Sequence, residues 1–227
     1  MKIAFIGTGL MGYPMAKNLI NKKLNLKVFS RTLEKAKPLE KLGAIIANSL
    51  GEAVKETDIV ITMLTDDEAV EKVLGDQEFL NNLKNSSTVI DMSSIKPKIA
   101  IKYGQLLKDR NIHFLDAPVS GGTIGAEEGS LAIMVGGDQN VFDGAFDTLK
   151  IMGNPTLVGP IGSGQVSKLA NQIIVGVTIG AVAEAITLCE KAGVDANKFI
   201  KALSGGFADG KILQNHGKRM IDKDFSP

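Results

Sequence analysis

A lysine and three amide side chains share one face of a predicted helix in the second half of the chain. Lys168 lies in the stretch GSGQVSKLANQ, and Gln165, Asn171 and Gln172 fall within about 60° of it on a helical projection. The rest of that helix is mostly apolar, so the lysine needs a partner, a cleft or a ligand beside it. Its amine is suited to donating or accepting a proton. The alternative is a lysine at a helix start whose ammonium reaches solvent.

A second chemically useful group is the segment Ser120, Gly121 and Gly122. It places one hydroxyl and two backbone N–H groups, unshielded by side chains, in direct succession. Such a cluster of donors suits a carboxylate, and a glycine-rich turn without a ligand is the alternative. We interpret the preceding Asp116 as a structural residue.

A glycine triplet near the start, in GTGLMG, follows the apolar run KIAFI and opens a helical segment. In a strand-turn-helix of this spacing the first glycine permits the tight turn, the second lets the backbone approach a pyrophosphate, and the third allows close packing of helix on strand. The helix N-terminus adds unpaired N–H groups. We therefore predict a dinucleotide site rather than a turn without a ligand. Its residues are Gly7, Thr8, Gly9, Leu10, Met11 and Gly12.

The next predicted strand, LKVFSRT, ends in Ser30, Arg31 and Thr32. It offers no carboxylate to the ribose 2′-OH of NAD, whereas a guanidinium and two hydroxyls suit a 2′-phosphate. The sequence therefore favours NADP as cofactor, with NAD as the alternative. A solvated surface arginine is the other interpretation of Arg31.

Two further strand ends are expected to face the same crevice, because ligands of open α/β sheets bind beyond the carboxyl ends of the strands. Met63, Leu64 and Thr65 would lie along the cofactor, and Ser93 and Ser94 would lie near the nicotinamide ribose. Serine and threonine also cap the helices that follow strands, so a purely structural role stays open.

These motifs lie in an alternation of short apolar strands and amphipathic helices that continues to about residue 160. The alternation predicts an α/β fold, a doubly wound and mostly parallel sheet with helices on both faces. Strand signals stop in GPIGSG and helical periodicity follows. We therefore predict a dinucleotide-binding domain over residues 1–162 and an all-helical domain over residues 163–227.

Composition excludes several classes of partner. Lys and Arg number 26 against 25 Asp and Glu, a net charge of +1, which gives no excess field to attract nucleic acid or an anionic membrane. One cysteine and two separated histidines predict no disulfide and no metal site, and fit a reducing cytoplasm. The apolar start breaks at Gly7, so no signal peptide is expected. The apolar run from Ile173 to Cys189 contains Glu184 and two glycines, and predicts a buried core helix rather than a membrane span.

Taken together, GTGLMGYPMAKNL, SRT, DAPVSGG and GSGQVSKLANQ resemble, in order, the four signatures of the β-hydroxyacid dehydrogenase family. That family includes 3-hydroxyisobutyrate dehydrogenases and the tartronate, glyoxylate and succinic semialdehyde reductases. The resemblance covers nearly the whole chain. It implies a Rossmann-type domain followed by an all-helical domain, with Lys168 as catalytic residue. It also implies carboxylate binding by Ser120, Gly121 and Gly122, and a substrate-positioning amide at Asn171.

Two departures from the family pattern stand out. The family often carries asparagine four residues after the lysine, where this sequence has Gln172, with Asn171 at three. Family members also continue past the equivalent of KDFSP into more helices, including a second lysine near the cofactor, so we expect the chain to be C-terminally incomplete. The resemblance implies that side chains of those further helices, together with pocket depth, would set the chain length of the substrate.

The resemblance implies hydride transfer between NADPH and an aldehyde or ketone of a small carboxylate-bearing substrate, with Lys168 moving the proton. An imine reductase is the enzymatic alternative, although that group usually replaces the lysine. A dinucleotide-binding module without catalysis is the non-enzymatic alternative. Small residues along the apolar helix, including Gly176 and Gly180, predict a homo-oligomer that forms through the helical domain.

Overall fold

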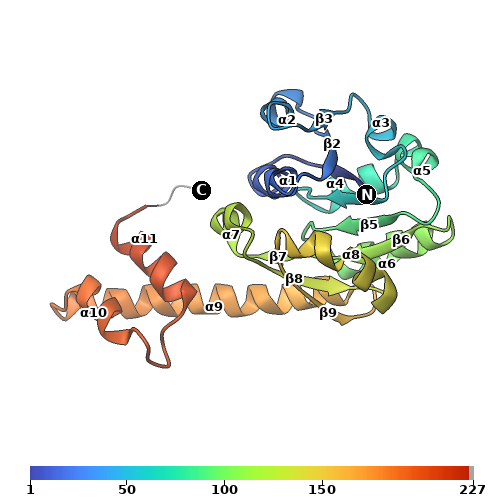
Figure 1. Cartoon of the computed structure of the whole chain (residues 1–227). Coiled ribbons are helices and arrows are strands. Elements are labelled where there is room, and N and C mark those ends of the chain that lie inside the picture. Colours follow the sequence, from blue (N-terminus) through green and yellow to red (C-terminus); the bar gives the residue numbers. More distant parts are fainter. Residues whose placement is uncertain (225–227) are drawn as a thin grey trace. The chain divides into compact units, whose positions relative to one another are not determined.

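A computed structural model describes residues 1–224, so the last three residues of the predicted helical domain lie outside the described part. The chain forms two compact units, Met1–Lys168 and Leu169–Pro227 (Figure 1). The division falls inside helix α9 (Ser163–Lys191), whereas the sequence placed it before that helix, after residue 162. The difference arises because the first turn of α9 is hydrogen-bonded into the first unit, at Asp116 and Ser93.

The first unit is built on one nine-stranded sheet in the order β3-β2-β1-β4-β5-β6-β8-β7, with β9 paired to β8. Strands β1 to β6 are parallel, and β8 is antiparallel to both β6 and β7. The predicted, mostly parallel doubly wound sheet is confirmed. The strands are β1 (Lys2–Ile6), β2 (Asn25–Phe29), β3 (Ile45–Ile46), β4 (Ile59–Thr62), β5 (Thr88–Asp91), β6 (His113–Asp116), β7 (Val119–Ser120), β8 (Leu131–Gly136) and β9 (Gly153–Gly159).

Helices connect the parallel strands β1 to β6, as parallel crossovers usually require. Several begin at an aspartate or serine whose side chain accepts a backbone N–H of the first turn, as Asp66 does for α4 and Asp138 for α8. The helices of this unit are α1 (Gly12–Asn21), α2 (Leu33–Glu40), α3 (Leu50–Val54), α4 (Asp67–Leu74), α5 (Gln77–Asn82), α6 (Pro97–Lys108), α7 (Gly122–Glu128), α8 (Gln139–Lys150) and the first turns of α9.

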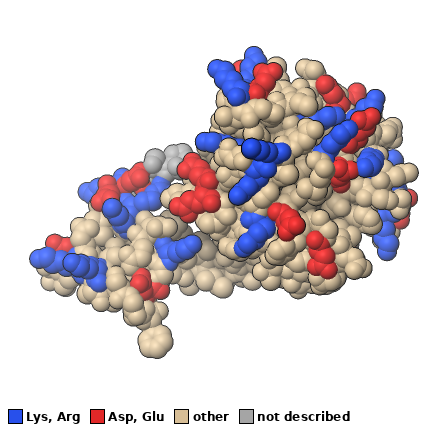
Figure 2. Space-filling model, in the orientation of Figure 1, with Lys and Arg blue, Asp and Glu red and all other residues tan. Residues whose placement is uncertain are grey.

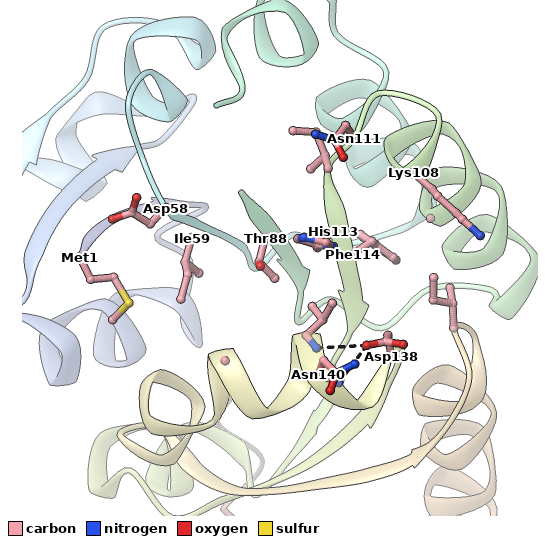
Figure 3. A pocket seen from close by; sticks show the side chains of 15 residues that line it. Met1, Asp58, Ile59, Thr88, Lys108, Asn111, His113, Phe114, Asp138 and Asn140 are labelled. Atoms are coloured by element: carbon pink, nitrogen blue, oxygen red, sulfur yellow. Dashed lines mark hydrogen bonds between the residues drawn. The ribbon is translucent and has the colours of Figure 1, made fainter. Parts of the chain in front are cut away.

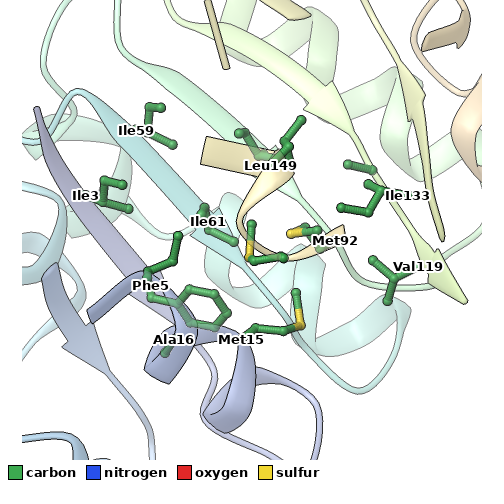
Figure 4. Close-up of a cluster of buried hydrophobic side chains, with 14 of the residues drawn as sticks. Ile3, Phe5, Met15, Ala16, Ile59, Ile61, Met92, Val119, Ile133 and Leu149 are labelled. Carbon is green, nitrogen blue, oxygen red and sulfur yellow. The ribbon is translucent and has the colours of Figure 1, made fainter. Parts of the chain in front are cut away.

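The core has two layers because the parallel strands are buried on both faces. In β1, Ile3 and Phe5 point into one cluster and Ala4 and Ile6 into the other. Figure 4 shows the first cluster, where Ile61 and Met92 lie near Phe5. This burial explains why the strands appear in the sequence as continuous apolar runs.

The second unit continues α9 and adds α10 (Ala196–Leu203), a π-helical segment (Leu213–Gly217) and α11 (Lys218–Ile221). Its small core comprises Val182, Ile186, Ala196, Ile200 and Leu213. The prediction that the apolar run of α9 is a buried core helix is wrong for this chain. Ile173, Ile174 and Val177 are each more than 60% exposed, because the few elements of this unit pack mainly on the later turns of the helix.

By length and composition alone, α9 is also a candidate for crossing a membrane, and 11% of its most apolar stretch is buried. Its first turn, however, contains the fully buried, hydrogen-bonded Gln165, which belongs to the folded first unit. Lysine and arginine are interspersed with aspartate and glutamate over the face drawn in Figure 2.

Candidate active site

The glycine-rich turn has the geometry predicted from its sequence. Gly7 has a φ of +100°, and a Cβ there would collide with the carbonyl oxygen of Met63. A Cβ at Gly12 would overlap the carbonyl oxygen of Gly7, whereas a Cβ at Gly9 would have no atom within 4 Å. The first and third glycines therefore allow close packing, and the second leaves the backbone open to a ligand.

A buried polar atom tests whether this turn fits a dinucleotide. The side chain of Thr8 is 4% exposed, and its hydroxyl has no hydrogen-bond partner among the described residues. Buried hydroxyls are normally paired, so an unpaired one beside an open backbone fits a phosphate acceptor. Leu10 is exposed and Met11 is half-buried at the rim of the same turn. The residues present therefore fit the pyrophosphate of a nicotinamide dinucleotide.

The end of β2 carries the residues predicted to select the cofactor. Arg31 and Thr32 are exposed and Ser30 is half-buried. Thr32 occupies the N-cap position of α2 without using its side chain to cap it. The Ala69 N–H and the Thr65 hydroxyl lower the pKa of Asp66, and Arg31 lowers it further through its charge. Arg31 is thus near the loop after β4, which contains the predicted Thr65.

A hydrogen-bond network joins the loops that follow β4 and β5. The hydroxyl of Ser93 donates to Asp91 Oδ1 at 2.6 Å and accepts the N–H of Leu64 at 2.9 Å. Thr62 also donates to Asp91 Oδ1, at 2.8 Å. Asp91 is completely buried, and this burial raises its pKa. Met63 and Leu64 are half-buried, and Ser94 and Thr65 are exposed. Because the Ser93 hydroxyl is engaged twice within the protein, the exposed hydroxyl at this strand end is that of Ser94.

The segment Ser120–Gly122 combines a half-buried serine with two exposed glycines. Gly121 and Gly122 have φ values of +144° and +63°, a region that residues with a side chain rarely adopt. A Cβ at Gly122 would have no atom within 4 Å. The predicted donors are therefore accessible, and their conformation depends on glycine.

The start of α9 is fixed by two buried polar side chains. Asp116, which ends β6, accepts the N–H of Gly162 at 2.7 Å and that of Gln165 at 2.9 Å. The carboxamide of Gln165 donates to the Ser93 carbonyl at 2.9 Å and accepts the Ile95 N–H at 3.0 Å. A Cβ at Gly164 would lie 2.6 Å from the Asp116 carbonyl oxygen, so the helix can approach the sheet this closely only with glycine there. The interpretation of Asp116 as structural agrees with these contacts.

Lys168 lies one turn after Gln165 on the same helix and is half-buried. Burial lowers its pKa. Asn171 follows one turn later, and its Oδ1 is buried without a hydrogen-bond partner among the described residues. A lysine of lowered pKa and an amide oxygen lacking a partner are groups suited to proton transfer and to ligand positioning.

Strand direction brings most of the predicted residues to one edge of the sheet. Ile6, Thr62, Asp91 and Asp116 are register partners in adjacent parallel strands, so the segments that follow them share that edge. Strand β7 runs in the direction of β6, since both are antiparallel to β8, and Ser120 therefore lies at this edge too. The glycine turn, the loops after β4 and β5, the serine-glycine segment and the start of α9 are thus neighbours by topology.

A cavity of about 780 Å³ lies at the opposite edge (Figure 3). It is lined by residues at the amino ends of the strands, such as Ile59, Thr88 and His113, together with Lys108 and Asn140 from helices α6 and α8. None of the predicted site residues lines it. It is therefore separate from the candidate active site.

Comparison with known proteins identifies the chain's relatives. Residues 2–164 match the family model for the NAD binding domain of 6-phosphogluconate dehydrogenase, and residues 162–227 match that for the NAD-binding region of NADP-dependent 3-hydroxyisobutyrate dehydrogenase. The chain is 43% identical to 2-hydroxy-3-oxopropionate reductase of Escherichia coli K12, over all of this chain and 78% of the relative. It belongs to the β-hydroxyacid dehydrogenase family.

Solved structures agree with this assignment. The chain superposes on Mycobacterium tuberculosis 3-hydroxyisobutyrate dehydrogenase, solved with L-serine, with a TM-score of 0.89 and 32% identity, over 100% of this chain and 80% of that one. The imine reductase of Myxococcus stipitatus, solved with NADP+, shares the fold with a TM-score of 0.81 at 20% identity, over 98% and 75% of the two chains. This β-hydroxyacid dehydrogenase is thus an oxidoreductase that acts on CH–OH groups with a nicotinamide dinucleotide.

Two residues that hold the site together were not among the predicted site residues. The sequence pattern indicates Gln165 only as a polar neighbour of Lys168, and the predicted site does not include Asp91. The signal available for Asp91 was a carboxylate ending the otherwise apolar strand TVID. The signal for Gln165 was its position one helical turn before Lys168, on a helix whose other residues are largely apolar.

Proposed function

We propose that this dehydrogenase reduces a small carboxylate-bearing aldehyde or ketone to the hydroxy acid, reversibly, with NADPH as the preferred donor. Candidate substrates are glyoxylate and the tartronate, succinic and methylmalonate semialdehydes, and in the reverse direction 3-hydroxyisobutyrate-type acids. The observation that carries this proposal is a half-buried Lys168 of lowered pKa on a helix anchored at the carboxyl edge of the sheet. The name of the E. coli relative, a 2-hydroxy-3-oxopropionate reductase, supports the substrate class.

Each residue has a role that its chemistry supports. A nicotinamide dinucleotide held by these residues would supply or accept the hydride at the substrate carbon. Lys168 donates a proton to the carbonyl oxygen as the alcohol forms, and its charge stabilises the developing alkoxide. In the reverse reaction the neutral amine accepts the hydroxyl proton, which a lowered lysine pKa favours near neutral pH. The Ser120 hydroxyl and the N–H groups of Gly121 and Gly122 bind the substrate carboxylate, and Asn171 orients the reacting group.

Residues of the glycine turn, Gly7 to Gly12, would hold the pyrophosphate, with the unpaired Thr8 hydroxyl as one donor. Arg31, Ser30 and Thr32 would hold the 2′-phosphate that distinguishes NADP from NAD. Met63, Leu64, Thr65, Ser93 and Ser94 would line the remainder of the cofactor. A homo-oligomer formed through the helical unit and a cytoplasmic location are parts of the same proposal.

The test is a substrate panel followed by one substitution. NADPH oxidation is measured with glyoxylate, the semialdehydes and a cyclic imine, and turnover is expected with at least one carboxylate-bearing carbonyl compound. Lys168→Ala should lower kcat by at least about 100-fold and leave the Kd for NADPH within about twofold, because general acid–base catalysis typically contributes that factor. Lys191→Ala, in the last turn of the same helix, is the matched control and should retain full activity.

Other outcomes would count against the proposal. Normal turnover of Lys168→Ala would remove the catalytic assignment. Activity with the cyclic imine alone would favour the imine reductase alternative. NADPH binding without turnover of any compound would favour the non-catalytic module.

A further inference from the structure

We infer that Gln165 is a positioning residue. Its side chain fixes the position of Lys168 relative to the loop after β5, which contains Ser93 and Ile95. This inference rests on the proposed catalytic role of Lys168 and adds a determinant of its position. The observation that carries it is the two-sided hydrogen bonding of one buried carboxamide. Gln165 is 1% exposed and sits one turn before Lys168 in α9.

The carboxamide of Gln165 spans two backbone groups of the loop after β5. Nε2 donates to the Ser93 carbonyl at 2.9 Å, and Oε1 accepts the Ile95 N–H at 3.0 Å. Two bonds from one planar group fix both the distance and the rotation of the helix face that carries it. Only a neutral side chain with a donor and an acceptor can make this pair, and an apolar side chain in the same volume can make neither bond.

The loop held by Gln165 is itself fixed to the rest of the carboxyl edge. Ser93 donates to Asp91 and accepts the N–H of Leu64, so hydrogen bonds join the loops after β4 and β5. The backbone of Gln165 is held separately by Asp116, which sets the height of the helix start above β6. Asp116 thus anchors the helix to the sheet, whereas the Gln165 side chain connects it to the loop predicted to lie against the nicotinamide ribose.

Because Asp116 and the Gln165 side chain hold different parts of the helix start, loss of the Gln165 side chain should affect kcat and cofactor affinity differently. Loss of the Gln165 side-chain bonds leaves the glycine turn and Arg31 untouched, so cofactor affinity should persist. The helix face that carries Lys168 would then lose its fixed distance to the cofactor loop, and a displacement of about 1 Å at a reacting group can cost on the order of 100-fold in rate. Gln165 should therefore affect kcat far more than it affects cofactor binding.

The test compares Gln165→Met with Gln139→Met. Gln139 is an exposed glutamine of α8 whose side chain donates a hydrogen bond to Asp143, so it controls for the same chemical change away from the site. Gln165→Met should lower kcat at least tenfold with the Kd for NADPH within twofold, and Gln139→Met should match the wild type. In the cofactor-free protein, NMR hydrogen exchange should show faster exchange of the Ile95 amide in Gln165→Met alone.

The outcomes separate this inference from the proposed function. Wild-type kcat in a folded Gln165→Met protein overturns the positioning role, as does a rise in the NADPH Kd that accounts for the whole loss of activity. If the methionine variant fails to fold, Gln165→Asn keeps the carboxamide but is one methylene too short to reach both partners, and the same kinetic signature is required of it. Absence of activity in the wild type would instead contradict the proposed function. The exchange rate of the Ile95 amide would still show whether its hydrogen bond to Gln165 holds the loop after β5.

Discussion

Asp116 gives the sharpest test of how the site is held, because its environment acts on its charge in two opposing ways. Burial raises the pKa of Asp116 to about 6, although the N–H groups of Gly162 and Gln165 favour the charged carboxylate. In an unfolded chain the pKa of the same carboxyl group is near its ordinary value of 3.8. The folded protein therefore binds more protons than the unfolded chain between these two values.

The sign and size of the pH effect follow from this difference. The contribution of Asp116 to the free energy of unfolding is fully present below its pKa in the unfolded chain, 3.8. It is lost as the pH rises through its pKa in the folded protein, about 6. A difference of about 2 pKa units corresponds to about 3 kcal/mol, of which about 2 kcal/mol falls between about pH 4.5 and about pH 7.5. Asp66 and Asp67, whose pKa values are lowered, act in the opposite direction, so the effect of Asp116 must be isolated by difference.

The assay is urea unfolding of the wild type and Asp116→Asn at several pH values. Asparagine cannot ionise, so the stability advantage of the wild type over the variant should shrink by about 2 kcal/mol from about pH 4.5 to about pH 7.5. At neutral pH the variant also turns an amide N–H₂ toward one of two backbone donors, at a cost of about 1–3 kcal/mol. Asp138→Asn, which alters an exposed helix cap of α8, is the matched control.

A stability difference between wild type and Asp116→Asn that stays constant over this pH range would refute the reasoning. It would mean that the two backbone donors and the N-terminus of α9 fully offset the desolvation of the carboxylate. The expected result concerns the free energy of unfolding of the wild type minus that of each variant. This difference should shrink with rising pH for Asp116→Asn and should not shrink for Asp138→Asn.

Three further predictions follow from the first unit and from α9. Gly12→Ala places a Cβ against the Gly7 carbonyl oxygen, so it should raise the NADPH Kd at least tenfold and lower the Tm, as measured by fluorescence titration and thermal unfolding; unchanged affinity would argue against the predicted turn as the cofactor site. Arg31→Ala should raise the KM for NADPH at least tenfold and leave that for NADH nearly unchanged; equal effects on both cofactors would remove the 2′-phosphate assignment. The exposed apolar side chains of α9, such as Ile173 and Val177, should be covered by a second copy, and light scattering should give at least twice the mass of one chain; a stable single-chain mass would contradict this.

Much of the sheet could be predicted because its strands obey one simple rule. Strands β1, β4 and β5 are buried on both faces, so they appear as continuous apolar runs between amphipathic helices. The shortest elements could not be predicted from this pattern. Strands β3 and β7 have two residues each, and α7 begins at Gly122 in a glycine-rich stretch that indicates a loop. A pattern of period two or 3.6 needs more residues than these elements contain.

The predicted candidate site had a similar limit. The glycine turn was predictable because its chemistry is local, as Gly7 and Gly12 meet within one turn. The anchors of α9 were not, because they join residues far apart in the chain: Asp116 lies 49 positions before Gln165, and Ser93 lies 72 before it. The exposure of α9 was mispredicted for a related reason. Apolar periodicity predicts that a face will be covered, but it does not tell whether the same chain provides the cover.

The placement of buried polar side chains argues that position, more than stability, governs the carboxyl edge. Among the described residues of the first unit, the buried polar side chains that hold this edge or the start of α9 include Thr62, Asp91, Ser93, Asp116 and Gln165, whereas Thr57, Ser87 and Thr148 are buried elsewhere. Apolar replacements of similar size would avoid the desolvation of these groups and could leave the fold intact. They would also remove the directional bonds that set the rotation and height of α9 over β5 and β6. Close packing alone permits a helix to slide or turn by fractions of an ångström, whereas the hydrogen bonds of Asp116 and Gln165 each specify one arrangement. The proton transfer that we propose for Lys168 depends on that arrangement.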